Sequence, residues 1–381
     1  MYKSVEMASK YYRSVFYFIL WMTLSVFTGN PALYASESKT PDGEGGEKFN
    51  AGKTIIEHII DAHEWHIAKV GETNITVPLP VILIDEGKIV CFMSGRFHHG
   101  ETSYNGYKLE NEGKNAGKIV KVKADGITVD EEASLPLDFS ITKNVLTIFI
   151  SVFLLCVIFI SIARKYKKRE GHAPKGLQSL VEPVILFIRD DIARPAIGEK
   201  KYEKYMPYLL TLFFFIFFTN LLGLIPFFPG GANVTGNVAV TMVLALFTFI
   251  ITTISSKRDY WLHIINTPGV PFWLKIPIPL MPLVELIGVF TKPFVLMIRL
   301  FANITAGHII ILGFMCLIFI FGQISPGLGY GISIVSIIFG IFMSLIELLV
   351  AFIQAYVFTL LSAIYFGMAM AGHEESHEHG H

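Results

Sequence analysis

The sequence has little charge for its length. Of its 381 residues only 16% are charged, whereas 52% are hydrophobic, and the mean hydropathy is +0.54. Because 31 basic residues balance 31 acidic ones, the net charge is zero and gives no support to a nucleic-acid partner. Several apolar runs reach about 20 residues, the length that crosses the hydrocarbon core of a bilayer. The composition therefore predicts a multi-pass membrane protein that is surrounded by membrane lipid.

Cysteine is scarce, and no metal or nucleotide motif is well formed. The three cysteines lie far apart and lack metal-ligand spacing: Cys91, Cys156 and Cys316. In "GGEKFNAGKT", Glu47 stands where a phosphate loop needs glycine. The stretch "HIIDAHEWHI" differs from HExxH, which favours a solvated helix face over a zinc site for its histidines, His58, His63 and His66. We expect no cofactor, no metal and no catalytic residue.

The N-terminus has the pattern of a secretory signal peptide. Lys3, Lys10 and Arg13 precede the 14-residue apolar run "SVFYFILWMTLSVF", and small residues follow near Ala32 or Ala35. This order is typical of a cleaved signal over residues 1–35 and is favoured over an uncleaved anchor. Either alternative places residues 36–140 on the outer side of the membrane.

Residues 36–140 predict a small exported, periplasmic α+β region. A polar Gly-rich linker comes first, and Lys53–Lys69 has a helical pattern. From Ile75 the pattern becomes strand-like, with "ITVPLPVILI", the turn "DEG", "KIVCFMS" and later "KIVKVKADGITVD". A region of this size is near the lower limit for burying its own core.

Five further apolar segments predict a mainly α, polytopic membrane domain over residues 141–370. They cover about 141–162, 207–225, 238–254, 278–321 and 332–369. Basic residues concentrate in the connections after the first and third segments, whereas "PFFPGGANVTG" and "QISPGLGYG" have none, so the positive-inside rule predicts a cytoplasmic C-terminus.

The last two segments exceed one perpendicular crossing. At about 1.5 Å per residue each would be about 55 to 65 Å long, so both must tilt, kink at Pro282 and Pro293, or extend beyond the membrane. The His/Glu-rich tail, residues 371–381, follows them and is predicted to be a disordered, solvated cytoplasmic end.

The fourth segment carries charged residues at helical spacing. Glu285, Lys292 and Arg299 are seven apart and share one helix face, which Asn303 continues. His308 lies nine positions after Arg299, about half a turn away, and so points to the opposite side. One helix therefore offers a charge to one neighbour and a titratable group to another.

The fifth segment carries a stripe of small and polar residues. It comprises Ser333, Ser336, Gly340, Ser344, Glu347, Ala351 and Gln354. A charged, unpaired Glu347 would cost ~2.5 to 3.5 kcal/mol in the membrane. A structural ion pair with Arg299 is the simpler explanation, but the many additional polar groups favour a proton path.

Three stretches together resemble subunit a of rotary F-type ATP synthases: "FTNLLGLIPF", "IRLFANITAGH" and "ELLVAFIQAYVFTLLSAIYF". The resemblance covers about residues 140–370. It implies a non-catalytic stator in a bacterial inner membrane, with two half-channels that serve a rotating subunit c ring. It also implies the peripheral stalk subunit b and the soluble ATPase sector as partners.

The resemblance also implies which residues act. Arg299 would face the ring, and Glu347 and His308 would belong to the proton path. The full set of proton-translocation candidates is Arg299, Glu347, His308, Gln354, Asn303, Glu285, Lys292 and Ser344. His308 and Glu347 stand where many bacterial members have glutamate and histidine, respectively.

Two other functions remain as alternatives. An independent ion-coupled secondary transporter would use Arg299 and Glu347 as a substrate-linked pair, although we find no convincing repeat in the sequence. An exported binding region on an inert anchor leaves the polar stripes unexplained.

Four charged residues lie on a predicted interfacial helix: Arg189, Asp190, Asp191 and Arg194. We expect these residues either to pair with one another or to contact the stalk.

Overall fold

Within its described residues, the computed structural model contains five helices that are long and apolar enough to cross a membrane, as the sequence predicts. These helices are α3 (Lys143–Lys168), α6 (Tyr202–Leu224), α7 (Val238–Ser255), α9 (Leu280–Ile324) and α10 (Pro326–Met370). The structure describes residues 50–70, 73–110, 115–123, 125–126, 128–130, 132–168, 173–225, 230–265 and 280–370. The predicted signal peptide and the C-terminal tail lie outside these residues.

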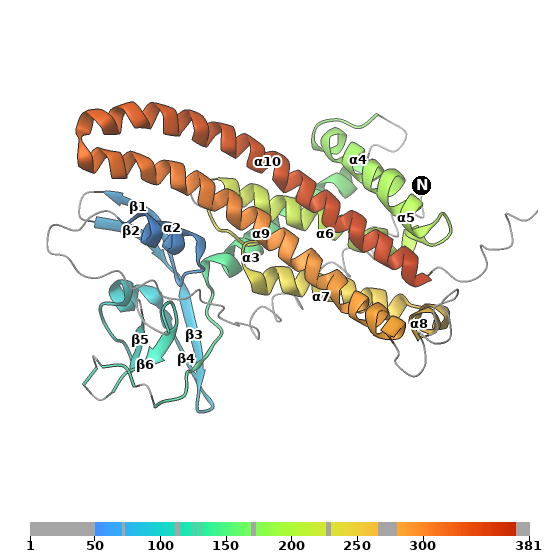
Figure 1. Cartoon of the computed structure of the whole chain (residues 1–381). Coiled ribbons are helices and arrows are strands. Elements are labelled where there is room, and N and C mark those ends of the chain that lie inside the picture. Colours follow the sequence, from blue (N-terminus) through green and yellow to red (C-terminus); the bar gives the residue numbers. More distant parts are fainter. Residues whose placement is uncertain are drawn as a thin grey trace, which may run out of the picture.

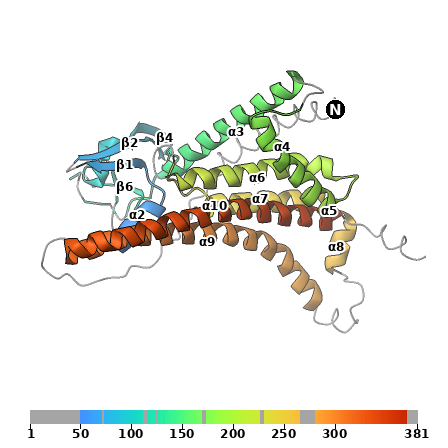
Figure 2. The same cartoon turned by 90° about the horizontal axis from the view of Figure 1, so that it is seen from above.

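Helices α9 and α10 form a long antiparallel hairpin that runs the length of the molecule (Figure 1). Each contains 45 residues, and Pro293 lies inside α9 without ending it. In Figure 2 the N-terminal part of α9 diverges from α10, whereas the two helices stay together toward their connection. Close approach there depends on glycine, because a Cβ at Gly329 would lie 2.8 Å from the Cα of Gly322.

Helix α6 forms the centre of the bundle. It packs against α3 and α10, and its aromatic and aliphatic side chains supply much of the largest buried apolar cluster. Members from α6 include Leu209, Leu212, Phe213, Phe214, Phe215 and Ile216. A helix that is apolar on all sides suits this position, since neighbouring helices cover it.

Shorter helices flank the bundle near the C-terminal end of α10. These are α4 (Leu177–Phe187), the π-helical turn η2 (Ile188–Ala193), α5 (Arg194–Ile197) and α8 (Arg258–Ile265). Asp190 accepts hydrogen bonds from both Arg189 and Arg194, each at 2.8 Å. Local pairing is therefore confirmed for Arg189, Asp190 and Arg194 of this cluster.

The N-terminal part of the described chain is a small α+β unit, here called the strand region (residues 50–141). It contains α2 (Ala51–Ile59), β1 (Glu64–Val70), β2 (Thr73–Pro78), β3 (Pro80–Asp85), β4 (Lys88–Met93), the 3-10 helix η1 (Ser94–Gly100), β5 (Tyr107–Leu109), β6 (Ile119–Lys121) and β7 (Leu137–Asp138). β3 and β4 form the predicted hairpin, and β7 pairs with the other edge of β3. Its core comprises Val81, Leu83, Phe97, Tyr107 and Ile119.

Two expectations for this region are wrong. The helix predicted over Lys53–Lys69 ends at Ile59, and β1 follows because it pairs with β2, with Trp65 opposite Val77. His63 does not lie on a solvated helix face; it is buried in the turn before β1 and contacts Asp138. Partners distant in sequence overrode the local helical pattern at both positions.

The strand region is packed onto the helices. Trp65 is only 3% exposed and belongs to the same apolar cluster as Ile148 of α3. Helix α2 packs against α9, and the amide of Lys143 donates to the carbonyl oxygen of Ala62. We call the end of the bundle beside this region the strand end, and the opposite end the C-terminal end (Figure 1).

Candidate functional site

The interface between α9 and α10 brings His308 and Glu347 together. The Nδ1 atom of His308 lies 2.5 Å from Oε1 of Glu347, and the side chains are 17% and 5% exposed. Gly307 makes this approach feasible, because a Cβ on it would lie only 3.0 Å from the same glutamate oxygen. Two residues that the sequence places on separate helices thus form one buried titratable pair.

Arg299 is not part of that pair. Its side chain is exposed, and within the described chain no carboxylate lies at salt-bridge distance from it. The structural lock between Arg299 and Glu347 is therefore absent from the described residues, since Glu347 meets His308 instead. Among the described residues, the charge of Arg299 acts electrostatically on Tyr365 of α10.

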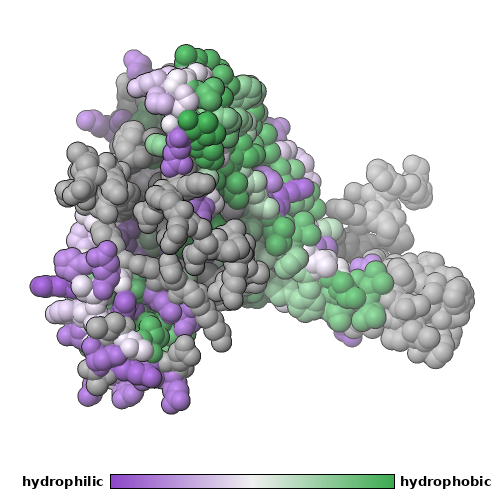
Figure 3. Space-filling model, turned by 60° about the vertical axis from the view of Figure 1, so that its left-hand side comes forward, coloured by the Kyte–Doolittle hydropathy of each residue, from purple (hydrophilic) through white to green (hydrophobic). Residues whose placement is uncertain are grey.

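Arg299 lies in an exposed patch of small and apolar side chains on α9, here called the Arg299 surface. It comprises Val295, Ile298, Arg299, Ala302, Asn303 and Ala306. Figure 3 shows hydrophobic surface along the long helices, in contrast to the hydrophilic surface of the strand region. Small residues allow the backbone of another helix to approach closely, so this surface suits a helical partner within the membrane.

The small and polar stripe of α10 is mostly buried against other helices. Its buried members are Ser336, Gly340, Glu347, Ala351 and Gln354. Ser344 is exposed, and its hydroxyl donates to the carbonyl oxygen of Gly340 at 2.9 Å. The stripe therefore provides room beside α9 rather than a lipid-facing surface.

Toward the strand end, α6 and the connection that follows it carry buried polar groups, and α6 borders His308 at Gly223. A Cβ at Gly223 would lie 3.8 Å from Nε2 of His308. Thr235 donates a hydrogen bond to Oδ1 of Asn220, while the buried amide nitrogens of Asn220 and Asn233 have no partner among the described residues. These asparagines were not among the sequence candidates, although Asn220 belongs to the stretch "FTNLLGLIPF" that carries the resemblance.

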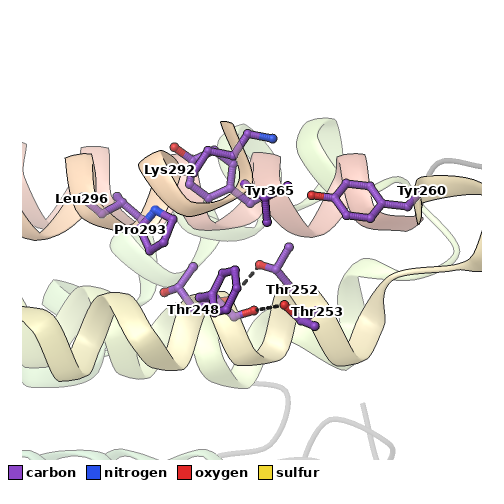
Figure 4. Close-up of a pocket in the computed structure, with 10 residues that line it drawn as sticks. Thr248, Thr252, Thr253, Tyr260, Lys292, Pro293, Leu296 and Tyr365 are labelled. Carbon is purple, nitrogen blue, oxygen red and sulfur yellow. Dashed lines mark hydrogen bonds between the residues drawn. The ribbon is translucent and has the colours of Figure 1, made fainter. Parts of the chain in front are cut away.

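Toward the C-terminal end, Lys292 and Glu285 are half-buried, whereas Arg299 is exposed. The Nζ atom of Lys292 lies 5.6 Å from the ring centroid of Tyr365, a cation–π distance. Figure 4 shows this lysine beside the tyrosine at a small pocket where α7, α8, α9 and α10 meet. Its polar lining includes Thr248, Thr252, Thr253, Tyr260, Lys292 and Tyr365.

No described group of three or more His, Cys, Asp or Glu side chains is arranged to hold a metal ion. The arrangement instead offers one exposed permanent charge, one buried titratable pair, and polar groups on both sides of that pair.

Comparisons with known proteins match the chain to one family and to relatives that share one name. Residues 145–367 match the family described as ATP synthase A chain, and residues 54–139 match a domain of unknown function, DUF8433. A protein of Chloroherpeton thalassium named ATP synthase subunit a is 44% identical over 64% of this chain and 71% of its own length. Proteins with the same name from Pelodictyon phaeoclathratiforme and Myxococcus xanthus are 44% and 42% identical, over 64% of this chain and 70% and 78% of their lengths.

Proposed function

Because this chain belongs to the family of ATP synthase A chains, we propose that it works as the proton-translocating stator subunit of the membrane sector of an ATP synthase. It is a non-catalytic membrane subunit of that complex. The observation that carries the proposed mechanism is the separation of two groups: Arg299 is exposed, while Glu347 is buried against His308.

Arg299 faces the rotating ring of subunit c. An exposed guanidinium lowers the pKa of a carboxylate that passes it, so the carboxylate releases its proton there. Arginine suits this role because it keeps its charge when water is excluded, whereas a desolvated lysine can lose its proton. The same charge prevents a proton from moving directly between the two half-channels.

The buried pair and its polar neighbours supply the two half-channels. On the strand side, protons pass Asn220, His308 and Glu347 to reach the ring. On the C-terminal side, they leave along Lys292 and the pocket beside Tyr365. Asn303, Ser344, Gln354 and Glu285 line these routes or the ring-facing surface.

The topology proposed for this function has the strand region outside and the C-terminus in the cytoplasm. The domains are a signal peptide over residues 1–35, an exported region over 36–140, a membrane domain over 141–370 and a cytoplasmic tail over 371–381. The membrane is a bacterial inner membrane, and the positive-inside distribution of lysine and arginine supports this orientation.

The other partners are the peripheral stalk subunit b and, through the complex, the soluble ATPase sector. The stalk fits the C-terminal end, where η2 and α5 flank the bundle. Arg189 and Arg194 both pair with Asp190 there, so a partner meets a preformed local cluster rather than free charges.

The test replaces Arg299 in the assembled complex. Arg299→Ala should abolish ATP-driven proton pumping in inverted membrane vesicles, while the soluble sector, once detached, still hydrolyses ATP. Arg164→Ala is a matched control, because Arg164 is an exposed basic residue at the far end of α3, and it should pump normally. Coupled pumping that persists in Arg299→Ala would exclude the ring-facing role.

Purification of the chain from its native membrane is a second test. Isolation without other ATP synthase subunits would favour the independent secondary transporter.

A further inference from the structure

A titratable pair lies where the strand region meets the first membrane helix. Nε2 of His63 lies 2.8 Å from Oδ2 of Asp138, and the other oxygen of Asp138 accepts a hydrogen bond from the amide of Ser140. The two side chains are 8% and 27% exposed, so Asp138 reaches solvent and His63 lies behind it.

Other charged groups surround this pair. The negative charges of Asp61 and Glu64 each act to raise the pKa of His63. The positive charge of Lys143 acts to lower the pKa of Asp61. Burial lowers the pKa of His63, but the hydrogen bond and charge of Asp138 outweigh it and leave that pKa raised. Burial likewise opposes ionisation of Asp138, yet His63 holds the pKa of this carboxyl below its ordinary value.

Asp61 joins this cluster to the start of α3. Its carboxylate accepts hydrogen bonds from the hydroxyl of Thr142 at 2.7 Å and from the amide of Asn144 at 3.0 Å. Burial raises the pKa of Asp61, and the hydrogen bonds from Asn144 and Thr142 offset this only in part. The charged cluster therefore directly adjoins the first turn of a membrane-spanning helix.

A row of buried polar side chains continues into the membrane from this turn. Asn144 is 3% exposed and its Oδ1 atom has no hydrogen-bond partner among the described residues, while Thr147 and Ser151 are fully buried one and two turns further on. Both hydroxyls donate to carbonyl oxygens of their own helix. A buried amide oxygen without a protein partner fits a bound water molecule.

The row leads toward the site already described. Helix α3 packs against α6, and the two run in opposite directions, so Asn144 and Asn220 both lie near the strand end. Asn220 is also buried with an unpartnered amide nitrogen, and Gly223, one turn further along α6, borders His308. Buried polar groups therefore lie at the strand end on both α3 and α6, and α6 also borders His308.

We propose that the strand region forms the outer mouth of the inlet half-channel, with His63 and Asp138 as the groups that take up protons from outside. A proton from outside water binds this pair, passes to water held beside Asn144, and leaves the pair ready for the next proton. This inference rests on the proposed function, because it supplies the route by which protons reach His308 and Glu347.

The experiment measures passive proton flux through membranes that contain the complex without its soluble sector. The double variant His63→Gln, Asp138→Asn should lower the flux per complex about tenfold or more, the scale of losing a positioned proton-transfer group. Wild-type flux should rise as the pH on the strand side falls through the pKa of His63, and this dependence should vanish in the double variant.

Asp85→Asn is the matched control. Asp85 is in the same region and pairs with Lys121 at 2.8 Å, but it lies in the β3–β4 hairpin and has no contact with α3 among the interactions described. Its flux and pH profile should equal those of the wild type. A double variant with fewer assembled complexes but unchanged flux and pH profile per complex would show a structural pair and overturn the inference.

Glu347→Gln distinguishes failure of this inference from failure of the proposed function. If Glu347→Gln blocks flux while the double variant conducts normally, only the outer mouth is wrong. If Glu347→Gln conducts normally, the proposed function of this site fails as well.

Discussion

Gly307 determines how closely Glu347 approaches His308. A Cβ there would lie 3.0 Å from Oε1 and 3.1 Å from Cδ of the glutamate, which is tighter than ordinary contact. Gly307→Ala should therefore displace the carboxylate, destabilise the chain by about 1 to 3 kcal/mol and reduce proton flux severalfold. Thermal unfolding of the purified complex and flux in reconstituted vesicles measure the two effects.

Gly313 on the same helix provides the comparison. A Cβ at that position meets nothing within 4 Å, and alanine in a helix is favoured over glycine by roughly 0.5 to 1 kcal/mol. Gly313→Ala should retain flux and unfold at an equal or higher temperature. Equal behaviour of the two variants would show that Glu347 tolerates the added methyl group.

The His63–Asp138 pair predicts a stability that depends on pH. Because the pKa of His63 is raised above its ordinary 6.5, its contribution is fully present below 6.5 and is lost as the pH rises through the raised value. Because the pKa of Asp138 is lowered from 3.8, its contribution is present above 3.8 and is lost as the pH falls through the lowered value. The pair therefore stabilises the strand region most between these two ordinary values.

Melting of the strand region, followed by the fluorescence of Trp65, measures this effect. A variant with the other tryptophans replaced by phenylalanine should melt at a higher temperature at pH about 5.5 than at pH about 8.5. Introducing Asp138→Asn into it should reduce the difference. A difference that survives this change would assign the pH dependence to other groups.

At the scale of elements, the α9–α10 hairpin depends on two glycines near its turn. A Cβ at Gly329 would lie 2.8 Å from the backbone of Gly322, where no flexible side chain can move aside. Gly329→Ala should separate the helix ends at a cost of about 1 to 3 kcal/mol. Gly331→Ala is the control, because its Cβ meets nothing within 4 Å, and it should leave the thermal unfolding temperature unchanged. Equal losses of stability in the two variants would disprove the close contact.

Hydropathy was sufficient to predict the membrane helices, because a bilayer requires long apolar segments and the sequence contains them. It did not predict β1, since the fate of Glu64–Val70 depends on pairing with β2 rather than on its own periodicity. It also could not show that Glu347 meets His308 rather than Arg299. Helical spacing determines which face a residue occupies, whereas the rotation of two packed helices determines which faces meet.

The two sides of α9 carry different functional groups. Its exposed side carries Arg299 among small residues, and its buried side carries His308 against α10. A helix with only the exposed charge could serve as an anchor, and a helix with only the buried pair could lock two helices together. Because both groups lie on one continuous helix, that helix fixes the distance between the charge and the titratable pair.

At the scale of the whole molecule, the polar and apolar parts are segregated. The strand region presents hydrophilic surface at one end of the bundle, and the long helices present hydrophobic surface along their length (Figure 3). The packed junction at Trp65 and Lys143 holds the first part at a fixed place relative to the second. The His63–Asp138 pair therefore has a fixed position beside the strand end of the helices.

The chain's own cysteines provide a test of the proposed orientation. Cys91 is exposed on β4, Cys156 is half-buried in α3 and Cys316 is buried in α9. A membrane-impermeant thiol reagent added to intact spheroplasts should therefore modify about one thiol per chain, and Cys91→Ser should abolish this labelling. If Cys91 reacts only after the membrane is inverted or permeabilised, the strand region lies inside. The strand end would then hold the proton outlet during ATP synthesis, and the outer mouth assigned to His63 and Asp138 would be on the wrong side of the membrane.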